Sequence, residues 1–133
     1  MSSEITIPAV LVLPEGMVGL PDVQTLDTTL IAGGQFVELV AREEPALGWL
    51  ACAAEDIRPG MTAELAAAGR IPEDAVLLVL MASHGEPAVV TANLAGPLSV
   101  GPDGETRQLV LEGADYPVQA RVGRLAPDPI ESR

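Results

Sequence analysis

This sequence is poor in the residue types that carry most protein chemistry. Its 133 residues include one cysteine, one histidine, and one each of tryptophan, tyrosine and phenylalanine. The lone Cys52 cannot form an intramolecular disulfide, which is typical of a protein in a reducing cytoplasm. Because aromatic residues are scarce, valine, leucine, isoleucine and alanine must fill the core, and apolar residues make up 48% of the chain.

Long apolar runs and basic clusters are also lacking. No run approaches the roughly 20 residues of a transmembrane helix. The start of the chain, MSSEITIPAV, has neither the basic nor the apolar stretch of a signal peptide. We therefore expect a cytoplasmic protein without a membrane span.

An excess of negative charge argues against two classes of partner. Acidic residues number 19 and basic residues 7, which gives a net charge of −12. Nucleic-acid phosphates and anionic lipids would both be repelled, so we expect no direct nucleic-acid partner and no membrane partner. A basic protein would be attracted. The simpler interpretation, that the acidity only confers solubility, stays open.

Short apolar segments separated by turn residues predict a mostly β fold. Glycine, proline and charged residues mark turns at residues 14–16, 33–35, 42–45, 85–87 and 101–104. The strand candidates between them cover residues 4–13, 28–32, 36–41, 47–53, 75–82, 88–94, 97–100 and 105–111. The segment 75–82 is apolar throughout, so we expect it to be buried on both faces.

One segment is predicted to be helical. Thr62 can cap a helix over AELAAA (residues 63–68), and Gly69 stands where a left-handed residue ends it. Many short strands and one short helix predict an all-β fold for the most part: a small β-barrel-like domain, or a sandwich, of antiparallel strands. This domain would cover residues 1–122. Residues 123–133, with two prolines and no periodicity, are expected to be a flexible tail.

The sequence offers little for catalysis or metal binding. His84 falls in an expected turn, and Cys52 falls in an apolar strand, where a buried small side chain is the simpler interpretation. The paired carboxylates, at residues 43–44, 55–56 and 73–74, stand in expected turns. Paired acid–base catalysis needs one carboxylate whose pKa is raised by burial, and adjacent exposed carboxylates do not provide that. We therefore expect no enzyme activity, no metal and no cofactor.

Three motifs in the second half are familiar: IPEDAVLLVL (71–80), VTANLAGPLSV (90–100) and RQLVLEGADYPVQ (107–119). They resemble motifs of the FliW family of flagellar assembly factors. LPEGMVGLPD (13–22) and EEPALGWLACAAEDIRPGM (43–61) are similar to family segments in the first half. The resemblance covers nearly the whole domain, and TANLAGP followed by YPV is its most specific part.

The chain departs from the family where the family is rich in aromatic residues. FVELVA (36–41) replaces an aromatic-rich segment, and Ala53-Ala54 replaces an Asp-Pro pair. Residues 55–58 replace further aromatic residues, and Met61 replaces a tyrosine. These departures explain the low aromatic content and bear on the partner surface of the first half.

The resemblance implies a small β-barrel-like protein that acts by contact. Members of the family bind flagellin in the cytoplasm and also bind the translational regulator CsrA. Free FliW withholds CsrA from flagellin mRNA, and accumulating flagellin takes FliW and releases CsrA. A basic RNA-binding regulator would be attracted by a partner of charge −12.

The motifs that carry the resemblance supply the candidate partner-binding residues: Thr91, Asn93, Leu94, Pro97, Glu112 and Tyr116. Strand alternation would point Thr91 and Asn93 toward solvent or a partner, with Val90, Ala92 and Leu94 on the other face. The alternative is structural, with Asn93 bonding to backbone at the turn near Gly96.

Two aromatic residues have competing interpretations. Tyr116 can plug one end of the barrel, with its hydroxyl on a polar partner, or contact a partner protein. Trp49 has the same two interpretations, core residue or interface anchor.

Two other functions are open from the sequence. One is a diverged binding module of the same fold that serves a different protein partner. The other is small-molecule binding or catalysis at the barrel mouth, which would need a deep pocket with a perturbed carboxylate or an inward-facing His84.

Overall fold

One antiparallel sheet organises the computed structural model, which describes residues 5–84 and 89–122. The strands are β1 (Val10–Val12), β2 (Thr25–Ile31), β3 (Phe36–Ala41), β4 (Gly48–Ala53), β5 (Val76–His84), β6 (Val89–Ala92), β7 (Leu98–Val100), β8 (Thr106–Gln108) and β9 (Ala120–Arg121). The helices are η1 (Ala32–Gly34), α1 (Ala54–Ile57) and α2 (Met61–Ala67). The predicted class, mostly β with antiparallel strands and a short helix, is confirmed.

The hairpins form where turn residues predicted them. β2 and β3 pair around η1, β3 and β4 pair around residues 42–47, and β7 and β8 pair around residues 101–105. Only Val10–Val12 of the predicted strand 4–13 is strand, because Pro8 has no N–H for a ladder. The turn expected at residues 85–87 and the tail expected at 123–133 lie outside the described residues.

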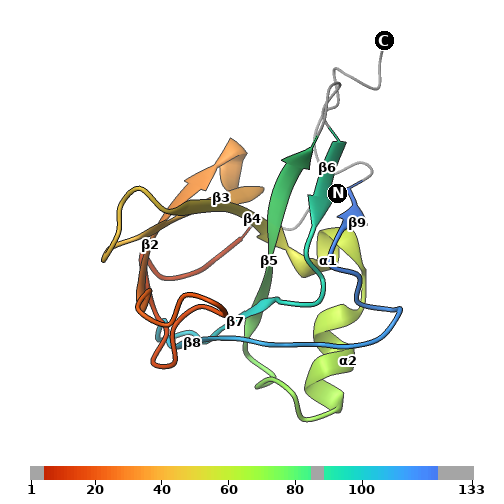
Figure 1. Cartoon of the computed structure of the whole chain (residues 1–133). Helices are drawn as coiled ribbons and strands as arrows, with labels where there is room; N and C mark the ends of the chain where they lie inside the picture. The colour runs from red at the N-terminus through yellow and green to blue at the C-terminus, as the bar shows by residue number, and fades with distance from the viewer. Residues whose placement is uncertain (1–4, 85–88, 123–133) are drawn as a thin grey trace.

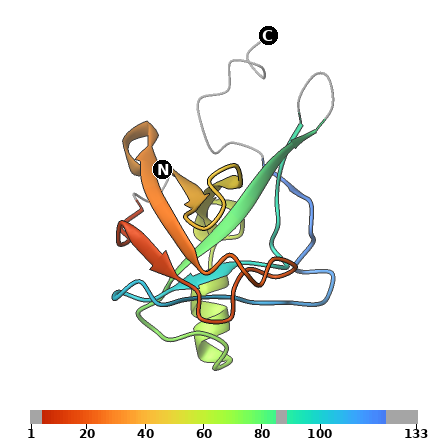
Figure 2. The same cartoon turned by 60° about the vertical axis from the view of Figure 1, so that its left-hand side comes forward.

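The sheet curls but does not close, which corrects the β-barrel-like prediction. β4 occupies one edge of β5, and the other edge is divided between β7 at its start and β6 at its end. The sheet therefore forks at β5, as Figures 1 and 2 show. The far ends of β1 and the β8 branch meet at one isolated bridge, Val12 with Glu105.

The sheet separates two apolar clusters, one on each face. The first lies in the hollow of the curled strands β1 to β4, and the second lies under α1, α2 and the segment after β8. Side chains alternate along β5, so Leu78 joins the first cluster while Leu77 and Val79 join the second. The expected burial on both faces is confirmed for Leu77–Val79, but not for the end of the predicted segment, where Ala82 is exposed.

Both clusters are built mainly from aliphatic residues, as the composition predicted, with Met17, Met61 and Cys52 also among the buried members. Completely buried side chains include Leu26, Leu39, Leu78 and Met61. Trp49 is partly buried and packs against the first cluster. Tyr116 packs against the second cluster, outside the curl of the sheet, so it does not plug a barrel end.

Helix α2 is confirmed, but its N-terminus is capped differently from the prediction. Thr62 lies inside the helix, and Gly60 is the N-cap. The carboxylate of Glu55 in α1 accepts hydrogen bonds from the backbone N–H groups of Gly60 at 2.8 Å and Thr62 at 2.7 Å. At the other end Gly69 is left-handed (φ 75°), as predicted.

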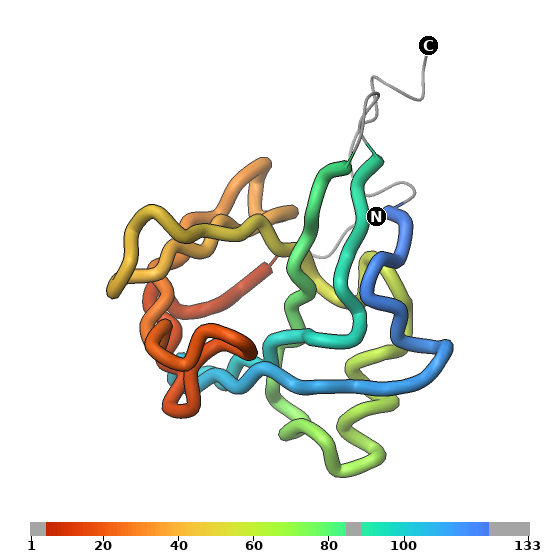
Figure 3. Tube along the Cα trace, viewed as in Figure 1, coloured from red at the N-terminus to blue at the C-terminus, as the bar shows by residue number. Residues whose placement is uncertain are grey.

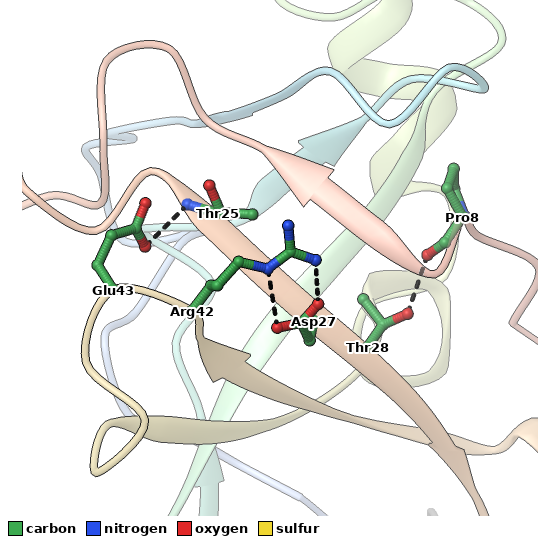
Figure 4. Close-up of polar contacts among 6 residues, drawn as sticks. All are labelled: Pro8, Thr25, Asp27, Thr28, Arg42 and Glu43. Atoms are coloured by element: carbon green, nitrogen blue, oxygen red, sulfur yellow. Dashed lines mark hydrogen bonds and ion pairs between the residues drawn. The ribbon is translucent and has the colours of Figure 1, made fainter.

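Polar contacts fasten the β2–β3 hairpin (Figure 4). The Arg42 guanidinium donates two hydrogen bonds to the Asp27 carboxylate, at 2.6 and 3.3 Å, and these lower the pKa of Asp27. Glu43 accepts a hydrogen bond from the N–H of Thr25 at 3.2 Å. The ion pair is about half exposed, so it contributes little to stability.

Replacing Gly104 with alanine should test the junction of the two ends of the sheet. Gly104 has φ 93°, and an added Cβ would lie 2.7 Å from the carbonyl oxygen of Val10. Gly69→Ala is the matched control, because φ is 75° there and the space is open. We expect Gly69→Ala to cost about 1–2 kcal/mol for backbone strain. Gly104→Ala should cost roughly 1–3 kcal/mol more because of the clash. If urea unfolding shows the same loss of stability in both variants, the two ends of the sheet are not in close contact at Gly104.

Glu55→Gln should destabilise the protein in a pH-dependent manner. Partial burial raises the pKa of the Glu55 carboxyl, but the N–H groups of Thr62 and Gly60 outweigh this and leave the pKa below its ordinary value. A lowered pKa contributes stability above the unfolded-state pKa, and that stability is lost as the pH falls through the folded-state pKa. The melting temperature of Glu55→Gln should therefore lie below that of the wild type at neutral pH and converge with it in acid. Glu73→Gln removes an exposed carboxylate of equal charge and is the control, which should melt close to the wild type at neutral pH.

Candidate partner-binding site

Thr91 opens the TANLAGP motif inside β6, and it is buried. Its exposed fraction is 7%, whereas Val90 is 37% exposed. The Thr91 hydroxyl lies 3.0 Å from Nε2 of His84, the exposed last residue of β5. Because Thr91 is buried, the prediction that it faces solvent or a partner is wrong. His84 ends a strand and does not lie in the predicted turn.

Asn93 shapes the turn at which the sheet forks. Its side-chain Oδ1 accepts hydrogen bonds from the N–H groups of Ala95 at 3.0 Å and Gly96 at 3.1 Å. Its own N–H still bonds to Leu80 of β5, at 2.8 Å. The chain therefore leaves β5 at Asn93 and returns to it as β7, which supports the structural interpretation of this asparagine.

Leu94 and Pro97 are also buried. Leu94 is 4% exposed and belongs to the second apolar cluster, and Pro97 is among the fully buried side chains. Their side chains therefore cannot contact a partner in this conformation. They hold the turn under the segment that follows β8, where the carbonyl of Pro97 accepts from Leu109 N–H at 2.9 Å.

Tyr116 is the centre of a polar cluster on the surface. Its hydroxyl donates a hydrogen bond to Glu64 Oε1, and the Arg58 guanidinium donates to Glu64 Oε2 at 3.1 Å. Arg58 also lies over the Tyr116 ring, 5.2 Å from its centroid. The hydrogen bond to Glu64 raises the pKa of Tyr116 and lowers that of Glu64. The predicted polar partner of the hydroxyl is thus found on α2.

The structure brings only part of the predicted set to the surface. Glu112 is exposed, and Asn93 and Tyr116 are partly exposed. Arg58 and Glu64 join this surface, although neither was among the candidates. Glu64 lies 52 residues from Tyr116 in the chain, so no local pattern could have paired them.

The groups suited to chemistry are either inaccessible or isolated. Burial raises the pKa of the Cys52 thiol to about 12. Within residues 5–84 and 89–122, no three His, Cys, Asp or Glu side chains gather as metal ligands would. A groove of about 760 Å³ lies between residues 14–18, residues 69–74 and the β7–β8 hairpin, and its lining includes neither histidine nor cysteine.

The described helices are short. Across the part of the chain that the structure covers, none has the length and apolar character needed to traverse a bilayer.

Asn93→Ala should destabilise the fold without changing partner affinity per folded molecule. Two backbone donors would lose their acceptor, at a cost of about 1–3 kcal/mol. Asn93→Asp keeps the acceptor oxygen and should stay within about 1 kcal/mol of the wild type. Denaturant unfolding measures both variants. A loss of affinity in Asn93→Ala at unchanged stability would instead make this side chain a direct contact.

Comparison with known proteins places the chain in a family. The family model described as FliW protein matches residues 2–122. The flagellar assembly factor FliW of Geotalea uraniireducens (strain Rf4) is 32% identical over 111 residues, which cover 78% of this chain and 68% of that protein. A crystal structure of the flagellar assembly factor FliW shares the fold, with a TM-score of 0.67, 19% identity, and coverage of 98% of this chain and 99% of that one. The chain belongs to the FliW protein family.

Proposed function

We propose that this protein is a flagellar assembly factor that binds flagellin in the cytoplasm and antagonises a CsrA-like translational regulator by direct contact. The observation that carries the proposal is the family match over residues 2–122, together with the 32% identity to a flagellar assembly factor. The match includes the TANLAGP and YPV motifs, which form the fork of the sheet and the Tyr116 cluster.

Electrostatics support a regulator as one partner. A protein that binds RNA presents basic side chains to the phosphates. This chain carries a net charge of −12, so long-range attraction would speed its approach to such a surface. Binding there would compete with RNA without any chemical step, which is consistent with the isolated His84 and the buried Cys52.

The exposed candidates define where contact is proposed. Glu112 and Tyr116 both lie in the segment that follows β8. Glu64 of α2 and Arg58, the residue that follows α1, contact Tyr116. This surface combines an aromatic ring, a guanidinium group and carboxylates, which are common contact groups at protein interfaces.

Titration calorimetry against flagellin and against the CsrA homologue of the same bacterium tests the proposal. Each should bind, and the affinity for the regulator should fall as salt rises, because screening weakens attraction between opposite charges. If neither protein binds at either of two salt concentrations, the flagellar role is wrong and a diverged binding module takes its place.

A charge reversal at Glu112 should locate the regulator's contact. Glu112→Lys should weaken binding of the regulator about tenfold, because a like charge would then face its basic surface. Glu44→Lys lies in the exposed β3–β4 turn and changes the net charge by the same amount. It should weaken binding of the regulator less than about threefold. Equal effects of the two variants would mean that only the total charge matters.

A further inference from the structure

The extended segment that follows β8 is paired on one side. Leu109 N–H donates to the carbonyl of Pro97 at 2.9 Å, and Leu111 N–H donates to the carbonyl of Ala95 at 2.7 Å. The side chains of Leu109 and Leu111 are 3% and 5% exposed and belong to the second apolar cluster. Backbone bonds and buried side chains therefore hold this segment alongside residues 95–97, beyond the end of β8.

The opposite side of the segment is open. Backbone polar groups alternate in direction along an extended chain, so those of Val110 point away from residues 95–97. No hydrogen bond among the described residues uses the N–H or C=O of Val110. The Val110 side chain is 62% exposed. An open edge with an exposed valine is a template for a further strand.

The surroundings of this edge are apolar at the centre and acidic at the ends. The N–H of Val18 donates to Oε1 of Gln108 at 2.8 Å, which brings the loop 13–22 beside the segment. Figure 3 shows this loop, in red and orange, next to the start of the blue trace. Val18 is 58% exposed. Glu105 and Glu112, both exposed, lie at either end of the edge. Arg107 is also exposed there, and its guanidinium donates a hydrogen bond to the carbonyl of Arg70 at 3.1 Å.

We propose that the open edge at residues 108–112 binds an extended peptide segment of another protein, in which apolar side chains alternate with lysine or arginine. The peptide would add as a strand, with its backbone bonded to the N–H and C=O of Val110. Its apolar side chains would pack on Val110 and Val18, and its basic side chains would lie near Glu105 and Glu112. A second copy of this chain fits less well, because two such edges would bring like charges together.

The edge shares Glu112 with the contact proposed for the regulator, but the peptide proposal rests on the open backbone of Val110 and not on the flagellar role, so failure of one leaves the other standing. The probe is a labelled seven-residue peptide, blocked at both ends, in which valine and lysine alternate. Fluorescence anisotropy measures its affinity for the full chain. Replacing lysine with glutamate in the peptide should weaken binding at least tenfold, and added salt should weaken binding of the lysine peptide.

Val110→Pro separates backbone pairing from packing. Proline removes the outward N–H and is tolerated at edge positions where that N–H faces solvent. The native bonds of the segment come from Leu109 and Leu111, so this variant should melt close to Val110→Ala. Val110→Pro should bind the lysine peptide at least tenfold more weakly than the wild type, and Val110→Ala should stay within threefold.

Backbone amide shifts of the wild-type protein give a second measurement that does not depend on a variant. The lysine peptide should shift the amides of Val110 and Glu112. Absence of binding, shifts confined to other parts of the chain, or equal affinities of Val110→Pro and Val110→Ala would overturn the proposal. If the protein instead associates with itself, if Val110→Pro abolishes that association, and if no peptide binds, the edge binds a second copy of this chain and the proposal is also wrong.

Discussion

The whole architecture depends on how β5 shares its edges. This strand spans Val76–His84, is buried on both faces near its start, and pairs with three strands at once. One edge takes β4, while the other cannot hold β6 and β7 side by side and so takes them one after the other. The chain must therefore leave the ladder between them, and Asn93 supplies the side-chain oxygen that stabilises that exit.

The fork creates two cores and explains how a chain with few aromatic residues fills them. Both clusters are filled mainly by aliphatic side chains and methionine, with Trp49 packed against the first and Phe36 and Tyr116 packed against the second. Met61 is completely buried where the FliW family resemblance places a tyrosine. Ala53 and Ala54, in place of an Asp-Pro pair, are buried where β4 meets α1.

Among the described residues, the charged side chains lie at the surface and not in the two apolar clusters. Ion pairs on the described surface include Arg42 with Asp27 and Arg58 with Glu64. Most of the 19 acidic residues have no basic partner available, since the chain holds only 7 basic ones. Some carboxylates accept hydrogen bonds from backbone N–H groups instead, as Glu55 does before α2 and Glu43 does at the start of β2. The remaining negative field is free to attract a basic protein, which favours function by contact.

The sequence by itself determined the mostly β class, the hairpin turns, the buried character of β5 and the end of α2 at Gly69. These features depend on residues only a few positions apart in the chain. The spacing of apolar residues, the residue types favoured in turns and the freedom of glycine at positive φ therefore encode them locally. The motifs also determined the family. Only the tertiary structure decided that the sheet forks instead of closing, that Thr91 is buried, that Glu55 rather than Thr62 caps α2, and that Tyr116 meets Glu64. Those outcomes depend on the register and curvature of the sheet, which bring distant residues together and which no local pattern specifies.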